Sequence, residues 1–288
     1  MMKETIQEAL NEAEDKTNIK TIKPVSGGSI NESFYVETDR HRYFIKYHPN
    51  APDHFFYLEK EGLEKIRETN SIRVPEVYAF SNEKQKAYLV LEWIEGETKP
   101  HTSSQLGRDI ARMHHSQAAK HGLDHSTFIG TLLQPNQLYN EWVDYYKECR
   151  LINQLNKGKE NGHISGNRQQ KLETLIEQLD QYIPKGIEPT YLHGDLWGGN
   201  WLAGSDGSPY VIDPSFLYGD RHFDLAFTEL FGGFSEEFYR AYQVENPIEP
   251  YYKDVKDLYQ LYYLLVHLNI FGEVYGGSVD RILYKYIG

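Results

Sequence analysis

The chain has 288 residues, of which 40% are apolar and 25% charged, and its formal net charge is −12. This composition describes a folded globular protein, long enough for two lobes around one cleft, and the negative charge argues against nucleic-acid binding through a broad basic surface. The single cysteine, Cys149, excludes a disulfide within one chain and a cysteine-based zinc site.

Residues 1–95 predict strands with one inserted helix. An amphipathic helix is expected first, over about Lys3–Asp15. The predicted strands are Ile19–Val25, Ser33–Glu37, His41–Tyr47, Tyr78–Phe80 and Ala87–Trp93, with the inserted helix at Phe55–Thr69. These elements indicate a small, β-rich N-terminal lobe.

Residues 96–288 predict a larger, mainly helical lobe. Thr102–Ser104 offers N-cap candidates for a helix that carries Leu106, Ile110 and Met113 on one face. Further helices are predicted at Asn140–Asn156, Arg168–Tyr182 and Leu258–Leu268, short strands at Tyr191–His193 and Pro209–Ile212, and a Gly- and Asn-rich loop at Lys157–Asn167. The fold class is therefore α+β, with two lobes that meet near residue 95.

A cytoplasmic protein without a membrane segment is expected. Met1–Asp15 is polar and acidic, where a secretory leader needs a basic end and an apolar run. The late apolar stretch Leu258–Phe271 is shorter than the about 20 residues that span a bilayer.

The sharpest chemical motif is His193-Gly194-Asp195-Leu196-Trp197-Gly198-Gly199-Asn200, followed by Val211-Ile212-Asp213. Phosphoryl transfer from ATP requires a carboxylate that accepts the proton of the attacking hydroxyl and oxygen ligands that hold magnesium. Asp195 fits the first role, and Asn200 and Asp213 fit the second. The spacing is similar to the protein-kinase pattern H-R-D-x-x-x-x-N followed by D-F-G, which predicts a protein-kinase-like fold.

The N-terminal lobe contains candidates for binding the phosphates of ATP. Gly27-Gly28-Ser29 lies between two strands, where backbone amides can cover phosphates. Lys46 ends the apolar run Tyr43–Ile45, a position from which a lysine can reach phosphates. Glu59 shares a helix face with the apolar residue four positions later and is the expected partner of Lys46, with Glu61 as the reserve.

A buried strand, Leu89–Glu92, is predicted to run into the linker between the lobes. The backbone around Glu92 and Ile94 is the expected contact for the adenine ring. Together with Lys46 and the glycine pair, this linker predicts an ATP site in the cleft between the lobes.

With these motifs, the chain resembles the fructosamine kinase (ketosamine kinase) family, which is related to aminoglycoside and choline kinases. The family-specific feature is Trp197, directly after His-Gly-Asp-Leu. Further similar segments are Phe128–Gly130, Gln134, Asn136, Trp142, Arg150-Leu151, Gln154, Tyr218–Arg221, Asp224–Ala226, Thr228–Phe234, Tyr259–Leu265, His267–Asn269 and Phe271-Gly272. The resemblance covers nearly the whole chain.

The resemblance implies an ATP- and magnesium-dependent kinase that phosphorylates a sugar hydroxyl, typically O3, of a ketosamine formed by glycation, in deglycation repair. It implies that Asp195 is the base, that Asn200 and Asp213 bind magnesium, and that Lys46 with Glu59 positions the phosphates. Trp197 either stacks on the substrate or packs the loop.

Asp224 either braces the catalytic loop by hydrogen bonds or touches substrate.

Two alternatives to a ketosamine kinase stay open at this point. A related kinase could act on an aminoglycoside, choline or another amino alcohol, although Trp197 and the C-terminal helix speak against this. A nucleotide-binding pseudokinase would need to lack one of the catalytic groups, and all of them are present. The sequence does not indicate an oligomeric state, a preferred sugar, or whether the substrate is free or protein-bound.

Overall fold

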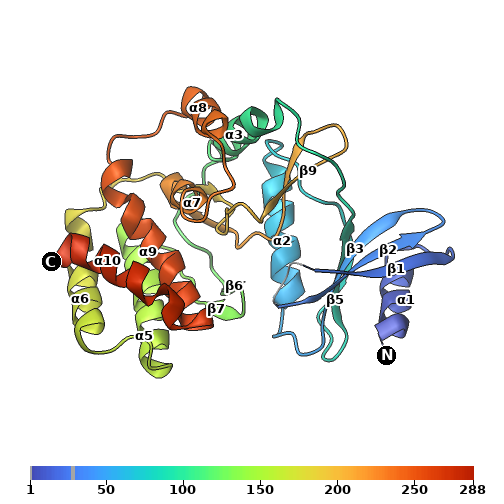
Figure 1. The fold of residues 1–288 in the computed structure, drawn as a ribbon, viewed down its shortest axis with the longest axis horizontal. Coiled ribbons are helices and arrows are strands. Elements are labelled where there is room, and N and C mark those ends of the chain that lie inside the picture. Colours follow the sequence, from blue (N-terminus) through green and yellow to red (C-terminus); the bar gives the residue numbers. More distant parts are fainter. Residues whose placement is uncertain (1, 27–29) are drawn as a thin grey trace.

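A computed structural model describes residues 2–26 and 30–288 (Figure 1). Within that part of the chain, the N-terminal lobe contains a five-stranded antiparallel sheet in the order β1-β2-β3-β5-β4. Its strands are β1 (Ile19–Val25), β2 (Glu32–Thr38), β3 (Arg42–His48), β4 (Val77–Ser81) and β5 (Ala87–Glu92), and its helices are α1 (Met2–Glu12) and α2 (Phe55–Glu68). The predicted β-rich lobe with one inserted helix is confirmed.

The two faces of the sheet carry different helices because side chains alternate along each strand. Tyr43 and Ile45 of β3 pack in one apolar cluster with Ile6 and Leu10 of α1. Lys46, one position further, therefore emerges on the opposite face, toward α2. Figure 1 shows α2 between the sheet and the C-terminal lobe, and Lys46 contacts Glu59 of α2 and Asp213 of the C-terminal lobe.

The C-terminal lobe is mainly helical, as predicted, with short two-stranded ladders. Its helices are α3 (Thr102–Met113), α4 (Trp142–Tyr145), the π-helix η1 (Tyr146–Leu151), α5 (Ile152–Glu160), α6 (Gly166–Glu177), the 3₁₀ turn η2 (Leu179–Gln181), α7 (Arg221–Thr228), α8 (Glu236–Glu245), α9 (Tyr252–Phe271), the 3₁₀ turn η3 (Glu273–Tyr275) and α10 (Gly276–Ile287). Its strands are β6 (Thr127–Ile129), β7 (Leu132–Gln134), β8 (Thr190–Leu192), β9 (Trp201–Ala203), β10 (Pro209–Val211) and β11 (Leu217–Gly219).

The predicted loop at Lys157–Asn167 is wrong at both ends, since α5 continues to Glu160 and α6 begins at Gly166. Gly158 lies within α5, and the side chain of Ile164 packs so closely against it that a Cβ there would lie 2.3 Å from Ile164 Cδ1. The glycine content of this segment therefore reflects close packing as well as a turn.

The predicted cap of α3 is also wrong, because Thr102 lies in the first turn of the helix and His101 occupies the N-cap position. The Thr102 hydroxyl donates instead to the carbonyl of Gly207, at 2.6 Å. Thr102, although threonine often caps helices, thus makes a tertiary contact instead.

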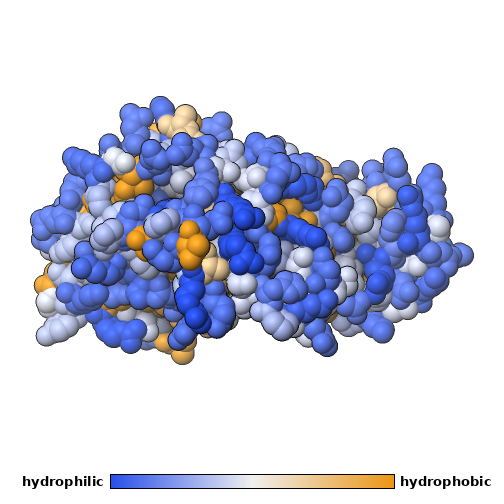
Figure 2. Space-filling model, turned by 90° about the horizontal axis from the view of Figure 1, so that it is seen from above, coloured by the Kyte–Doolittle hydropathy of each residue, from blue (hydrophilic) through white to orange (hydrophobic). Residues whose placement is uncertain are grey.

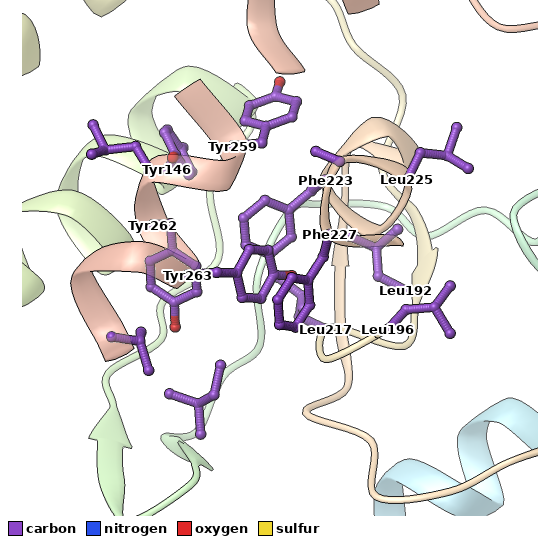
Figure 3. Packing of buried hydrophobic residues seen from close by; sticks show 14 of the residues in the cluster. Tyr146, Leu192, Leu196, Leu217, Phe223, Leu225, Phe227, Tyr259, Tyr262 and Tyr263 are labelled. Carbon is purple, nitrogen blue, oxygen red and sulfur yellow. The ribbon is translucent and has the colours of Figure 1, made fainter. Parts of the chain in front are cut away.

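A buried aromatic core supports the segment that contains the catalytic motif (Figure 3). Phe223 and Phe227 of α7 face the tyrosines of α9, and the rings of Phe227 and Tyr263 stack with centroids 3.6 Å apart. Leu192 and Leu196, on either side of the motif's aspartate, pack in the same cluster. Burial of this apolar surface fixes the loop between them to the rigid part of the lobe.

The face shown in Figure 2 is largely hydrophilic, with apolar side chains in small separate groups. This agrees with the high content of charged residues. In the described part of the chain, none of the helices combines the length and the apolar content that crossing a membrane requires.

Candidate active site

A cavity of about 610 Å³ lies between the two lobes. The N-terminal lobe lines it with Lys46 of β3 and Glu59 of α2, and the C-terminal lobe lines it with Asp195, Asn200 and Asp213. The structure therefore brings together the polar residues that the sequence predicts for phosphate, base and metal roles.

Lys46 joins the two lobes through its side chain. Its Nζ donates to Glu59 Oε1 at 2.7 Å and to Asp213 Oδ1 at 2.5 Å. The reserve candidate, Glu61, contacts His125 at 2.9 Å instead. Glu59, which the sequence places on the same helical face as Leu63, is therefore the glutamate that contacts Lys46.

Lys46 is 4% exposed, and its charge is kept by its neighbours. Burial opposes the ammonium form, but the carboxylates of Asp213 and Glu59 outweigh it and raise the pKa of Lys46 above its ordinary value. Burial raises the pKa of Glu59, and the charge of Lys46 acts in the opposite direction. Lys46 is therefore a fixed positive charge in the wall of the cavity.

Lys46→Ala is expected to lower kcat/KM for MgATP by about 30-fold to about 1,000-fold, which corresponds to roughly 2–4 kcal/mol of transition-state stabilisation. The reason is the loss of a preorganised charge that, in its predicted role, faces the phosphates of ATP. Steady-state kinetics check this, with Lys60→Ala on the outer part of α2 as the control. Unchanged kinetics would place the ATP-binding lysine elsewhere.

Asp195 and Asn200 lie on the loop that follows β8. The Asn200 side-chain amide donates to Asp195 Oδ2 at 2.9 Å and to the Asp195 carbonyl at 2.8 Å. Burial, together with the charges of Asp213 and Asp224, raises the pKa of Asp195 to about 7, although the Asn200 hydrogen bond works against this shift. A carboxylate with this pKa can accept a proton near neutral pH.

The pKa of about 7 for Asp195 predicts a pH dependence of activity. Below pH 7 the carboxyl group of Asp195 becomes protonated and cannot accept the proton of the acceptor hydroxyl. We therefore expect kcat/KM, which reports ionisations of the free protein, to fall about tenfold per pH unit in this range. Above pH 8 the rate should be flat with respect to this group. A kcat/KM profile from pH 5 to 9 tests this, and a rate that is flat between pH 5.5 and 7.5 would contradict it.

Asp213 adopts a left-handed backbone conformation, with φ of +56°. This conformation is unfavourable for a residue other than glycine and requires support from its surroundings. The support comes from hydrogen bonds on both sides, from Ile212 N to the Asn200 carbonyl and from Ser215 N to the His193 carbonyl. They turn the Asp213 carboxylate toward Lys46 and the cavity.

Asp224 braces the catalytic loop and does not reach the cavity, which corrects its candidate role as a substrate residue. Its side chain is fully buried, and it accepts from His193 N at 2.7 Å and from Gly194 N at 2.8 Å. Tyr263 donates to the Gly194 carbonyl on the other side, at 3.0 Å. The imidazole of His193 lies 2.9 Å from the Ile212 carbonyl, so it also holds backbone.

Trp197 is 39% exposed and lines the cavity. Its ring lies over Gly199, where a Cβ would come within 2.3 Å of the ring. Because residue 199 is a glycine, the Trp197 indole can lie against it on the cavity wall. A molecule bound in the cavity can contact the exposed part of the ring.

The remaining predicted nucleotide contacts are Gly27, Gly28, Ser29, Glu92 and Ile94. Gly27, Gly28 and Ser29 are outside the described residues. Glu92 and Ile94 are not among the described residues that line the cavity, and the Glu92 amide donates to the Glu76 carbonyl.

Sequence reasoning missed the apolar lining of the cavity and one polar residue. Val25 and Phe44 line it from the sheet, and Leu202 and Ile212 line it from the C-terminal lobe. Phe44 could have been found, since it lies two positions before Lys46 on the same face of β3. Asn31 also lines the cavity, and its buried Oδ1 has no hydrogen-bond partner among the described residues.

A small antiparallel sheet with α2, a helical lobe and this cavity between them define a protein-kinase-like fold. Solved structures show the same fold at low identity: choline kinase LicA from Streptococcus pneumoniae superposes with a TM-score of 0.61 at 16% identity, covering 99% of each chain. A Haemophilus somnus structure with the provisional name fructosamine-3-kinase superposes with a TM-score of 0.86 at 29% identity, covering 100% of this chain and 97% of that chain.

The family described as "Fructosamine kinase" matches residues 1–288, and the chain belongs to this family. It is 41% identical over 272 residues to a Lactiplantibacillus plantarum protein named "Probable ketoamine kinase", covering 94% of this chain and 95% of that protein. It is 32% identical over 291 residues to "Protein-ribulosamine 3-kinase, chloroplastic" of Arabidopsis thaliana, covering 100% of this chain and 89% of that protein.

Proposed function

We propose that the chain is an ATP-dependent kinase that phosphorylates a sugar hydroxyl, at O3, of ketosamines such as fructosamine, ribulosamine or erythrulosamine adducts. The observation that carries this proposal is the convergence of Lys46, Asp195, Asn200 and Asp213 on one cavity in a member of the fructosamine kinase family. Removal of such adducts by phosphorylation would be a repair reaction on glycated amines.

The proposed roles follow from the chemistry of each side chain. Asp195 accepts the proton of the acceptor hydroxyl, since it combines access to the cavity with a pKa of about 7. Lys46 binds the phosphates of ATP, held in place by Glu59. These residues orient the reactants and place charge where the transferring group needs it.

Asn200 and Asp213 have the oxygen atoms that magnesium prefers, and we assign the metal to them. Residues 2–26 and 30–288 contain no group of three or more His, Cys, Asp or Glu side chains placed to hold a metal. A magnesium ion bound by two protein ligands takes its remaining ligands from phosphates and water, which suits an ion that arrives with ATP. The metal supplies charge stabilisation for the transferring phosphoryl group.

Membership of the fructosamine kinase family supports a ketosamine acceptor over an aminoglycoside or choline. Trp197 lines the cavity and is 39% exposed, so its ring is available for a cation–π contact with an amine of the acceptor. The likeness to aminoglycoside and choline kinases lies at 13–17% identity and concerns the fold alone. A pseudokinase is not supported, since each catalytic group lines the cavity.

An acceptor panel tests the proposal. Purified protein with magnesium and ATP is offered fructosyl-lysine, ribulosyl-lysine and erythrulosyl-lysine beside choline and kanamycin, and ADP formation is measured. Turnover of a ketosamine that is lost in Asp195→Ala is the expected result. Turnover of choline or kanamycin with all ketosamines inert would overturn the substrate class but retain the kinase mechanism.

The proposed substrate is free or protein-bound ketosamine, without a nucleic-acid or membrane partner. A cytoplasmic location remains a prediction, and a curated plant relative is named chloroplastic. Cell fractionation followed by immunodetection tests the location directly.

A further inference from the structure

The hairpin β6–β7 contributes one wall of the cavity, which residues 127–130 line. The ring centroid of Phe128 lies 5.3 Å from that of Phe55, in the first turn of α2. On the other side, the Phe128 carbonyl accepts from the Ser215 hydroxyl at 2.8 Å. The hairpin therefore closes the cavity between α2 and the segment that follows Asp213.

This wall lies away from the linker between the lobes. Phe44 pairs with Leu91, the residue before the end of β5, so it marks the end of the cavity that is nearest the linker. Lys46 lies two positions further along β3 and contacts α2, the helix that the hairpin also meets. A nucleotide with its base at the linker and its phosphates at Lys46 leaves the hairpin wall free to contact the acceptor.

Asn136 ties the two ends of this hairpin together. It lies just after β7, and its side-chain amide donates to the carbonyl of His125, just before β6, at 3.0 Å. The same amide donates to Thr127 Oγ1, also at 3.0 Å. The Asn136 carboxamide therefore closes the open end of the hairpin, opposite the turn at Gly130.

Two donors fix the direction in which this carboxamide points. The Tyr145 hydroxyl donates to Asn136 Oδ1 at 2.7 Å, and Arg150 Nη2 donates to the same oxygen at 3.1 Å. A guanidinium can only donate, so the carboxamide oxygen faces Arg150 and its N–H groups face the hairpin. Arg150 is 1% exposed and stacks on the Tyr145 ring, and it has no carboxylate partner among the residues that the structure describes.

We propose that Asn136 is a positioning residue for the acceptor: it holds hairpin β6–β7 as the wall against which the acceptor binds, and Arg150 and Tyr145 orient it. The proposal rests on the proposed function, because the KM of the acceptor is its kinetic readout. Asn136 is not among the described residues that line the cavity, so it acts through the hairpin.

The short strands explain why one side chain matters this much. A hairpin with three residues in each strand has little stability of its own, so contacts at its open end decide whether it is ordered. An acceptor that binds to an ordered wall does not have to supply the free energy of ordering it. Loss of the tie should therefore weaken acceptor binding and leave nucleotide binding at Lys46 unchanged.

Asn136→Asp separates positioning from stability. The carboxylate still accepts from Tyr145 and gives the buried guanidinium of Arg150 an anionic partner, so Tm should stay at or above that of wild type. It cannot donate to the His125 carbonyl, so the hairpin loses its tie. We expect KM of the acceptor to rise about fivefold to about thirtyfold and KM of MgATP to stay within about twofold.

Two further variants support the comparison. Asn140→Asp, at an exposed position four residues later, is the control for one added negative charge. Tyr145→Phe removes one of the two donors and keeps the ring, so it should give the same pattern at about twofold to about fourfold. Steady-state kinetics for acceptor and MgATP, with thermal unfolding, are measured for all three.

Hydrogen exchange by mass spectrometry tests the tie without any substrate. In Asn136→Asp, the amides of residues 123–134 should exchange about tenfold faster than in wild type, with α7 and α9 unchanged. Unchanged exchange in the hairpin overturns the proposal, and so does a loosened hairpin with an unchanged acceptor KM. Equal losses for acceptor and MgATP at a lowered Tm would show a purely structural role and overturn it as well.

Failure of the proposed function is visible separately, in the wild-type protein. If wild type turns over no ketosamine, the proposed substrate class is wrong, whatever the variants do. The KM comparison is then made with the acceptor of the panel that is turned over, and the exchange result stands as measured.

Discussion

Asp195→Asn is expected to lower kcat by about 10²-fold to 10⁴-fold, the contribution of a positioned general base. The amide has nearly the shape of the carboxylate but cannot accept the proton of the attacking hydroxyl. The backbone contacts of the loop, including the bond from Asn200 to the Asp195 carbonyl, do not involve the substituted group. The substitution should therefore remove the chemistry without unfolding the loop.

The measurement is single-turnover transfer to a ketosamine acceptor, together with ATP affinity by calorimetry and Tm by calorimetric scan. ATP affinity should change by less than about threefold, because Asp195, in its proposed role as base, contacts the acceptor and not the nucleotide. Asp206→Asn, on the exposed turn between β9 and β10, provides a control for loss of one negative charge. A kcat within tenfold of wild type would show that another group accepts the proton.

Asp213→Ala is expected to abolish detectable transfer, because it removes a proposed carboxylate ligand of magnesium and with it several kcal/mol of charge stabilisation (about 10³-fold or more in rate). The substitution also frees Lys46 from one of its two carboxylate partners and leaves it with Glu59. Loss of activity at saturating ATP, with the lobe still folded, is the predicted pattern.

Asp213→Asn separates the metal role from the backbone role. Asparagine tolerates the left-handed conformation at this position and retains one neutral oxygen ligand. We expect residual activity that rises with magnesium concentration well beyond the wild-type optimum. Activity of Asp213→Ala within tenfold of wild type, or an unchanged magnesium requirement in Asp213→Asn, would show that the metal is held elsewhere.

Local pattern was sufficient for much of the fold and for the polar side of the candidate site. The position of Lys46 after the apolar run Tyr43–Ile45 identified the lysine that enters the cavity, and the helical period selected Glu59 over Glu61 as its partner. Both conclusions depend on short-range features of one strand and one helix, which hold wherever the element forms.

Local pattern failed where packing overrides residue type. Gly158 is of a residue type that favours loops, but it lies inside α5, where the side chain of Ile164 packs against it. Thr102 is of a residue type that often caps helices, but its hydroxyl donates to the Gly207 carbonyl. Residue type alone shows neither contact, because each depends on how the chain folds back after the helix.

The sequence by itself determined the order of the motifs, the two-lobed α+β class and the family, because the spacing of Asp195, Asn200 and Asp213 and the tryptophan after the first of them are local features. Tertiary structure decided which groups meet. It joined Lys46 to Asp213 across the lobes, and it placed Asp224 behind the loop between His193 and His114 rather than in the cavity. The physical reason is that burial and hydrogen-bond partners depend on segments that meet only when the chain has folded.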